Sequence, residues 1–142
     1  MDALVIPGGF GAAKNLTDWA FKGPDGNILH DVKRIINEMV LNDKPVCGLC
    51  MGPTVIAMAL AGSGIKASLT VGSDREPSPY DIRAISQGME KTGASAVMRT
   101  IQEIELDRDN HIVSAPCYMM EASISQIREN VNAAIDALFD ML

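Results

Sequence analysis

The five-residue segment Gly48-Leu49-Cys50-Met51-Gly52 constrains the fold more than any other feature of the chain. It joins an apolar run at 46–49, which predicts a short strand, to a helix expected from about 53 to 61. A nucleophilic residue with glycine two positions before and two positions after it has the spacing of a nucleophile elbow. In an elbow the central residue adopts a strained backbone conformation, and larger side chains at the glycine positions would collide with the turn. The segment therefore predicts a strand, a sharp turn and a helix, with Cys50 at the turn.

Apolar runs and amphipathic segments alternate along the rest of the chain, which predicts an α/β fold with a mostly parallel sheet and helices on both faces. The other strands are expected at 2–6, 67–72, 101–106 and 112–115, and the other helices at 29–41, 80–92 and 121–142. The last two strands are expected to form a β-hairpin near residues 101–115, because turn-forming residues join them. The strand at 2–6 reads as fully buried, yet the parallel strands are few for a doubly wound sheet. Either the sheet is small or N-terminal strands are missing.

Length, charge and cysteine usage narrow the class of protein. A chain of 142 residues is about one domain, and a net charge of −6 without a basic run speaks against a nucleic acid partner. The longest apolar stretches, such as 54–61, fall well short of the roughly 20 residues needed to cross a membrane, so no membrane partner is expected. Three cysteines without a disulfide-framework spacing indicate a reducing compartment. We expect a cytoplasmic protein, with the mitochondrial matrix as the alternative for a eukaryotic source.

Cys50 is the candidate catalytic residue. The helix that follows it directs backbone N–H groups and the positive end of its dipole toward the sulfur, which favours a thiolate. One alternative is a small, inert core cysteine. Another is a redox pair with Cys47 in a C-x-x-C arrangement, but Cys47 lies inside the expected strand and should point away from the turn. A zinc site is weaker still, because the Cys and His residues show no second paired spacing.

The glycine-rich loop Pro7-Gly8-Gly9-Phe10-Gly11 follows the strand at 2–6. Ligands in parallel sheets bind beyond the carboxyl ends of the strands, where this loop and Cys50 are both expected. We expect the backbone N–H groups of Gly9 and Met51 to form an oxyanion hole, with an ordinary strand-ending turn as the alternative. The loop is not a dinucleotide fingerprint, because the third glycine of that motif is absent.

Four further residues are candidates for substrate binding: Lys14, Asn15, Pro116 and Tyr118. Lys14 and Asn15 flank the glycine loop, and their alternative role is helix capping or solvent exposure. Pro116 and Tyr118 are expected to shape the wall of the site, and their alternative role is packing.

An acid or base partner for Cys50 does not stand out in the sequence, although a catalytic cysteine normally needs one. His30 begins a helix that looks exposed, and His111 lies beside a turn where solvent exposure is expected. Residue 51 is methionine, so no histidine directly follows the nucleophile.

At these residues the chain resembles the ElbB-type, amidotransferase-like branch of the ThiJ/PfpI superfamily, within the class I glutamine amidotransferase-like proteins. The resemblance is carried in order by residues 2–16, 44–52, 70–74, 109–113 and 116–119. It implies a flavodoxin-like, doubly wound fold, a homodimer, Cys50 as nucleophile and no metal or organic cofactor. It also implies an N-terminal portion ahead of residue 2, with the first strands and a glutamate that contacts the cysteine. Residues 1–142 are therefore expected to form a single, N-terminally truncated ThiJ/PfpI-like domain.

The same resemblance implies a function. It predicts a cofactor-independent glyoxalase, a lyase that converts glyoxal or methylglyoxal to hydroxy acids through a Cys50 hemithioacetal without glutathione. The chain would be inactive by itself if the upstream glutamate is required. The alternatives are a non-enzymatic stress or redox sensor with an oxidisable Cys50, or a protein associated with isoprenoid biosynthesis. The alternative of an amidase or protease is weakened because residue 51 is methionine and not histidine. It also rests on analogy of fold, which is a poor guide to reaction.

Overall fold

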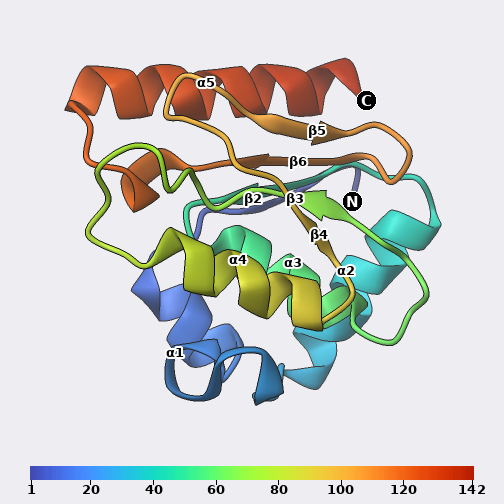
Figure 1. The fold of residues 1–142 in the computed structure, drawn as a ribbon. Coiled ribbons are helices and arrows are strands. Elements are labelled where there is room, and N and C mark those ends of the chain that lie inside the picture. Colours follow the sequence, from blue (N-terminus) through green and yellow to red (C-terminus); the bar gives the residue numbers. More distant parts are fainter.

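The computed structural model describes residues 1–142 and has a four-stranded sheet at its centre (Figure 1). Its order is β1 (Leu4–Ile6), β2 (Val46–Leu49), β6 (Ile112–Ala115) and β5 (Glu105–Asp107). The first three strands are parallel, and β5 pairs antiparallel with β6 as the predicted hairpin. Two short parallel strands, β3 (Ser68–Leu69) and β4 (Ser95–Ala96), form a second sheet beside β5 and β6. The predicted mostly parallel sheet is confirmed.

Helices cover both faces of the central sheet, as the sequence predicts (Figure 1). The long helix α5 (Ile124–Asp140) runs along one face, over β6 and β2. On the opposite side lie α2 (His30–Leu41), α3 (Gly52–Leu60) and α4 (Ile82–Lys91), with the short α1 (Trp19–Lys22) farther out. Single turns of 3-10 helix at Gly23–Asp25 and Cys117–Met119, and a π-helical turn at Ala12–Leu16, complete the chain.

Helix α3 is buried along its whole length, because it packs between the sheet, α2, α4 and the turn at Ala12–Leu16. Its sequence, Gly-Pro-Thr-Val-Ile-Ala-Met-Ala-Leu, has no charged residue and accepts apolar neighbours all round. Pro53 lies in the first turn, where its missing N–H costs no hydrogen bond. The helix therefore begins at a fixed place directly after β2, which fixes the turn that contains Cys50.

Strand β1 is an edge strand, so the expectation of a fully buried strand at 2–6 was wrong. It pairs with β2 alone, and Val5 is 39% exposed. An apolar cavity of about 210 Å³ lies along β1, where Leu4 and Ile6 face Val32 and Ile36 of α2.

Other element boundaries also differ from the expected ones. The strand expected at 67–72 is reduced to two residues, because Thr70 turns away and its N–H donates to the Ser114 hydroxyl. The strand expected at 101–106 begins only at Glu105, and Ile101 lies in a turn. Strand β4 was not expected, since two residues carry no periodic pattern.

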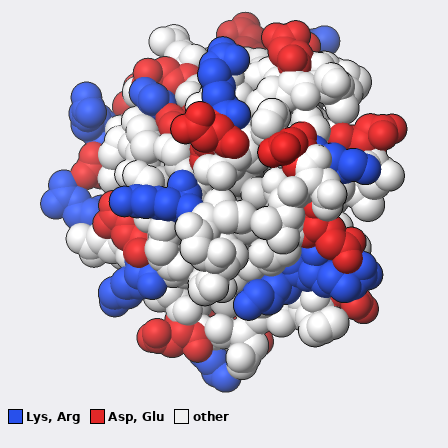
Figure 2. Space-filling view, turned by 90° about the vertical axis from the view of Figure 1, so that its right-hand side faces the viewer, with Lys and Arg blue, Asp and Glu red and all other residues white.

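The surface shown in Figure 2 mixes acidic and basic side chains around an uncharged middle. No large patch of one sign appears on that face. No helix of the structure combines the length and the hydropathy that crossing a bilayer requires.

Candidate functional site

Cys50 occupies a sharp turn between β2 and α3, with a φ of 58°. Residues with a side chain rarely adopt this left-handed conformation, so the surrounding structure must hold it in place. The Cys50 N–H donates to the carbonyl oxygen of Ala115 at the end of β6, at 3.0 Å. The backbone conformation that the elbow spacing predicts is therefore present at Cys50.

The glycines on either side of Cys50 have the steric role that the spacing predicts. A Cβ at Gly48 would lie 2.9 Å from the Cδ1 atom of Ile56 and 3.0 Å from the backbone nitrogen of Pro53. A Cβ at Gly52 would lie 2.5 Å from the carbonyl oxygen of Ile6. The turn consequently packs against β1 on one side and against its own helix on the other.

The glycine-rich loop after β1 touches the elbow. A Cβ at Gly8 would lie 2.1 Å from the Leu49 carbonyl oxygen and 2.9 Å from both the Cys50 Cβ and the Met51 nitrogen. Gly8 and Gly9 have φ values of 82° and 76°, which glycine adopts without strain. This close approach is possible only because residue 8 has no side chain.

Three backbone donors of the glycine-rich loop and the elbow have no acceptor within the chain. The N–H groups of Gly8, Gly9 and Met51 make no backbone hydrogen bond and no hydrogen bond to a side chain. Such donors beside a nucleophile are suited to binding an oxyanion that forms on a substrate. Gly9 and Met51 are the two residues that the sequence predicts for this role, and Gly8 is an additional donor in the same loop.

The two other cysteines are buried close to the elbow. Cys117 follows β6 at the same edge of the sheet, and burial raises the pKa of its thiol to about 12. Cys47 lies inside β2, and burial raises its pKa to about 12 as well. Both thiols therefore stay protonated at neutral pH. Neither thiol is suited to act as a nucleophile at neutral pH.

The predicted substrate-binding residues fall into two places. Pro116 and Tyr118 flank Cys117 at the carboxyl end of β6, next to the elbow, with Pro116 buried and Tyr118 exposed. Lys14 and Asn15 lie on the turn at Ala12–Leu16 and line a separate cavity of about 120 Å³, together with Asp18. Cys50 does not line that cavity.

The two histidines lie away from Cys50. The His30 side chain is exposed at the start of α2, as expected. His111 was expected in solvent but is half-buried, with its Nδ1 atom 3.8 Å from the Oδ1 atom of Asp43. This atom has no hydrogen bond, and its position in the β5–β6 turn is at the amino end of β6, opposite to the elbow.

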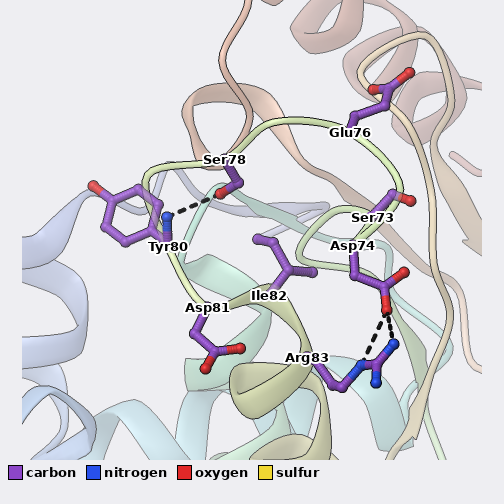
Figure 3. A pocket seen from close by; sticks show the side chains of 8 residues that line it. All are labelled: Ser73, Asp74, Glu76, Ser78, Tyr80, Asp81, Ile82 and Arg83. Carbon is purple, nitrogen blue, oxygen red and sulfur yellow. Dashed lines mark hydrogen bonds and ion pairs between the residues drawn. The ribbon is translucent and has the colours of Figure 1, made fainter.

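A polar cavity of about 380 Å³ lies in the loop that leads from β3 to α4 (Figure 3). Its wall includes Asp74 and Arg83, whose ion pair measures 2.6 Å, and the Tyr80 side chain. The Arg83 guanidinium lowers the pKa of Asp74 through this hydrogen bond. Ser78 ties the same loop to the Cys117–Met119 turn by donating to the Met119 carbonyl oxygen. The local sequence does not predict this cavity, because a cavity depends on how distant segments pack.

Two curated mitochondrial proteins are similar to almost the whole chain. Human glutamine amidotransferase-like class 1 domain-containing protein 3, mitochondrial, is 29% identical over 143 aligned residues, which cover 99% of this chain and 51% of that protein. The rat ES1 protein homolog, mitochondrial, is also 29% identical, over 99% of this chain and 52% of its own length. No family model matches the chain. The chain thus has homologues among the glutamine amidotransferase-like class 1 domain proteins and spans about half their length.

Solved structures support the same fold. An isoprenoid biosynthesis protein with an amidotransferase-like domain from Ehrlichia chaffeensis is 26% identical, with a TM-score of 0.81 over 100% of this chain and 60% of that one. Rapid Encystment Protein 24 KDa from Francisella tularensis is 14% identical, with a TM-score of 0.60 over 97% of this chain and 58% of that one. The first of these shows that the amidotransferase-like, flavodoxin-like fold extends over the whole described chain.

Proposed function

We propose that this chain supplies the nucleophile and the oxyanion hole of a cofactor-independent glyoxalase that acts on small 2-oxoaldehydes. The observation that carries the proposal is the contact between the Gly8-Gly9 loop and the Cys50 elbow. The N–H groups of Gly8, Gly9 and Met51, which have no acceptor within the chain, support the proposal as donors to an oxyanion formed at Cys50. Only 8% of the Cys50 residue is exposed, which favours a small substrate.

The reaction begins when the Cys50 thiolate adds to the aldehyde carbon of the substrate. A carbon–sulfur bond forms and the carbonyl electron pair moves to oxygen, where the Gly9 and Met51 N–H groups stabilise the negative charge. A base then transfers the hydrogen of that carbon to the neighbouring carbonyl carbon, and water hydrolyses the resulting thioester to a hydroxy acid. In the branch that the chain resembles, this base is a glutamate located upstream of the segment that corresponds to β1.

The decisive experiment compares methylglyoxal turnover by wild type, Cys50→Ala and Cys47→Ala, each as the chain itself and with an N-terminal extension that supplies the glutamate. We expect Cys50→Ala to fall to the uncatalysed rate, because no other cysteine has a reactive thiol at neutral pH. The Cys47→Ala variant removes a thiol from the same strand and should keep its activity. Turnover that is unchanged in Cys50→Ala would show that the mechanism is wrong.

A second measurement tests the nucleophile apart from complete turnover. The rate of Cys50 alkylation by iodoacetamide is followed over about pH 5 to 9 by peptide mass spectrometry. We expect Cys50 to react selectively and already near neutral pH, while Cys47 and Cys117 stay unmodified in the folded protein. Equal reaction of all three cysteines, or none at Cys50, would contradict an activated elbow.

A connection with isoprenoid biosynthesis is a second proposal, supported by the Ehrlichia protein whose name includes that pathway. It is favoured by a fold match that covers the whole chain. This connection is tested by deleting the gene in its source organism. The isoprenoid levels of the deletion strain are then compared with those of a Cys50→Ala strain. Unchanged isoprenoid levels in both strains would contradict the connection.

A mitochondrial location is proposed from the names of the two curated relatives. It replaces the cytoplasm as the favoured compartment if the source is eukaryotic. Cell fractionation followed by detection of the protein tests it, and recovery from the cytosol alone would contradict it.

A further inference from the structure

Cys50 and Cys117 follow two neighbouring parallel strands at the same edge of the sheet. The register of β2 and β6 pairs Leu49 with Ala115, so Cys50 lies one residue beyond this pair and Cys117 two residues beyond it. Adjacent strands are about 4.8 Å apart, and disulfides join residues whose Cα atoms are about 4.4–6.8 Å apart. The spacing between these neighbouring strands is therefore one that a disulfide between their ends can span.

Both cysteines leave their strands through the same unusual backbone conformation. Cys50 has a φ of 58° and Cys117 a φ of 50°, although neither is glycine. The buried side chain of Asn130 on α5 holds Cys117 in place, because its Oδ1 atom accepts from the Cys117 N–H at 2.8 Å. The Asn130 Nδ2 atom in turn donates to the Glu103 carbonyl oxygen at 2.9 Å, which anchors this amide.

The two thiols influence each other electrostatically. Burial is the main cause of the raised pKa of Cys117, the backbone of Cys50 acts against that rise through a hydrogen bond, and the charge of a Cys50 thiolate adds to it. Both influences act over short distances, in agreement with the neighbouring positions that the strand register gives these two residues. Cys117 therefore stays protonated, whereas Cys50 lies at a helix N-terminus, which favours a thiolate. The two cysteines thus differ in role: Cys50 is the residue that is oxidised, and Cys117 is its partner.

We propose that Cys50 and Cys117 form a reversible disulfide when a hydroperoxide oxidises Cys50, with Cys117 as the resolving cysteine. This modification goes beyond the proposed catalytic role, since it withdraws the nucleophile and protects it from irreversible oxidation. The charge of Cys117 also acts on Cys47 and adds to the raised pKa of that thiol. Cys47 nevertheless lies inside β2 opposite Val113 and has no exposed surface, so we expect a hydroperoxide to react with Cys50 first.

The chemistry balances in two steps. The Cys50 thiolate attacks one peroxide oxygen, the O–O bond breaks, and sulfur loses two electrons to become a sulfenic acid while the other oxygen leaves and takes a proton. The Cys117 sulfur then attacks the Cys50 sulfur, the S–O bond breaks, and the hydroxyl leaves as water with the Cys117 proton. Two thiols and one hydroperoxide thus give one disulfide, one alcohol or water from the peroxide, and one water.

The test treats the reduced, full chain with hydrogen peroxide and maps its cysteines by peptide mass spectrometry. Fragment ions between residues 47 and 50 identify which of these two cysteines is bridged. We expect one intramolecular Cys50–Cys117 bridge that dithiothreitol removes. We expect the same bridge in Cys47→Ala. Its formation rate should rise with pH, because the resolving thiol must lose its proton.

The variant Cys117→Ser separates a resolving role from simple proximity. We expect it to keep its circular dichroism spectrum and its Cys50 alkylation, but to accumulate Cys50 sulfinic and sulfonic acids that dithiothreitol does not reverse. A bridge between Cys47 and Cys50, a bridge between two chains, no oxidation of Cys50, or equal sulfinic acid in Cys117→Ser and wild type would each overturn the inference. Normal Cys50 alkylation and turnover without a bridge would overturn this inference alone and leave the proposed function standing.

Discussion

Gly52 leaves no room for a side chain, because its missing Cβ would press against the Ile6 carbonyl oxygen of β1. This oxygen belongs to the backbone and cannot rotate away as a flexible side chain would. The space between β1 and the start of α3 is therefore set by one residue, and the position of Cys50 depends on that spacing.

The substitution Gly52→Ala should consequently destabilise the fold by about 1–3 kcal/mol, since the strand or the helix must move to admit a methyl group. Urea unfolding followed by circular dichroism measures this loss. The matched control is Gly11→Ala, where the backbone is helical with a φ of −59° and the new Cβ would meet only the Asn15 Nδ2 atom at 3.6 Å. Equal stability of the two variants would contradict the steric role of Gly52.

At this scale the sequence predicts the elbow well and the rest of the site poorly. The positions of Gly48, Cys50 and Gly52 follow from local spacing, because an elbow imposes its steric demands within five residues. The proximity of Cys117 does not follow from local sequence, since it arises from the register of strands that are more than sixty residues apart in the chain. The approach of His111 to Asp43 likewise joins two different turns, which the local sequence does not indicate.

At the scale of elements, α5 begins with a reciprocal cap. The Ser123 hydroxyl accepts from the Gln126 N–H at 3.2 Å, and the Gln126 side chain accepts from the Ser123 N–H at 2.9 Å. The helix then runs for 17 residues and carries Asn130, which holds Cys117. The start of this helix therefore influences the turn that follows β6.

Replacing Ser123 by alanine should cost about 1 kcal/mol, because it removes one half of the capping box. Thermal or urea unfolding detects the loss. Ser125→Ala is the control, since Ser125 is exposed within the same helix and makes no cap. If both variants unfold at the same urea concentration, the cap contributes nothing measurable.

Elements with a clear apolar pattern were predicted close to their true bounds, whereas two short helical turns were missed. Strands β2 and β6 coincide with the expected ranges, and α2 begins one residue later than expected. Helix α1 and the turn at Ala12–Leu16 have four and five residues, which is too short for a helical repeat to be visible. Ile124, the first residue of α5, is exposed.

At the scale of the whole molecule, the buried thiols make stability depend on alkaline pH. Burial raises the pKa of Cys47 and Cys117 to about 12 in the folded protein. In the unfolded chain a thiol loses its proton near about pH 8.5. The contribution of these thiols to stability is therefore fully present below that pH and is lost progressively as the pH rises toward about 12.

Unfolding by urea in the presence of a reductant should thus show a smaller pH dependence for Cys47→Ala than for wild type. Between about pH 8 and 10 we expect wild type to lose roughly 1–2 kcal/mol more stability than Cys47→Ala. Val113→Ala is the control, because it removes buried side-chain volume from the residue that pairs with Cys47 without removing a titrating group. Identical pH slopes for Cys47→Ala and wild type would show that the thiol has no such influence.

The homodimer that the family resemblance implies stays a prediction.

Helix α3 has no exposed residue, and this has a consequence for how the elbow opens. Amides in such a helix exchange with solvent only through unfolding of the entire molecule, so no partial opening releases the turn at its N-terminus. The number of molecules with an intact elbow then equals the number of folded molecules. Loss of Cys50 selectivity on heating should follow the melting curve itself, which makes this thiol an internal reporter of the folded fraction.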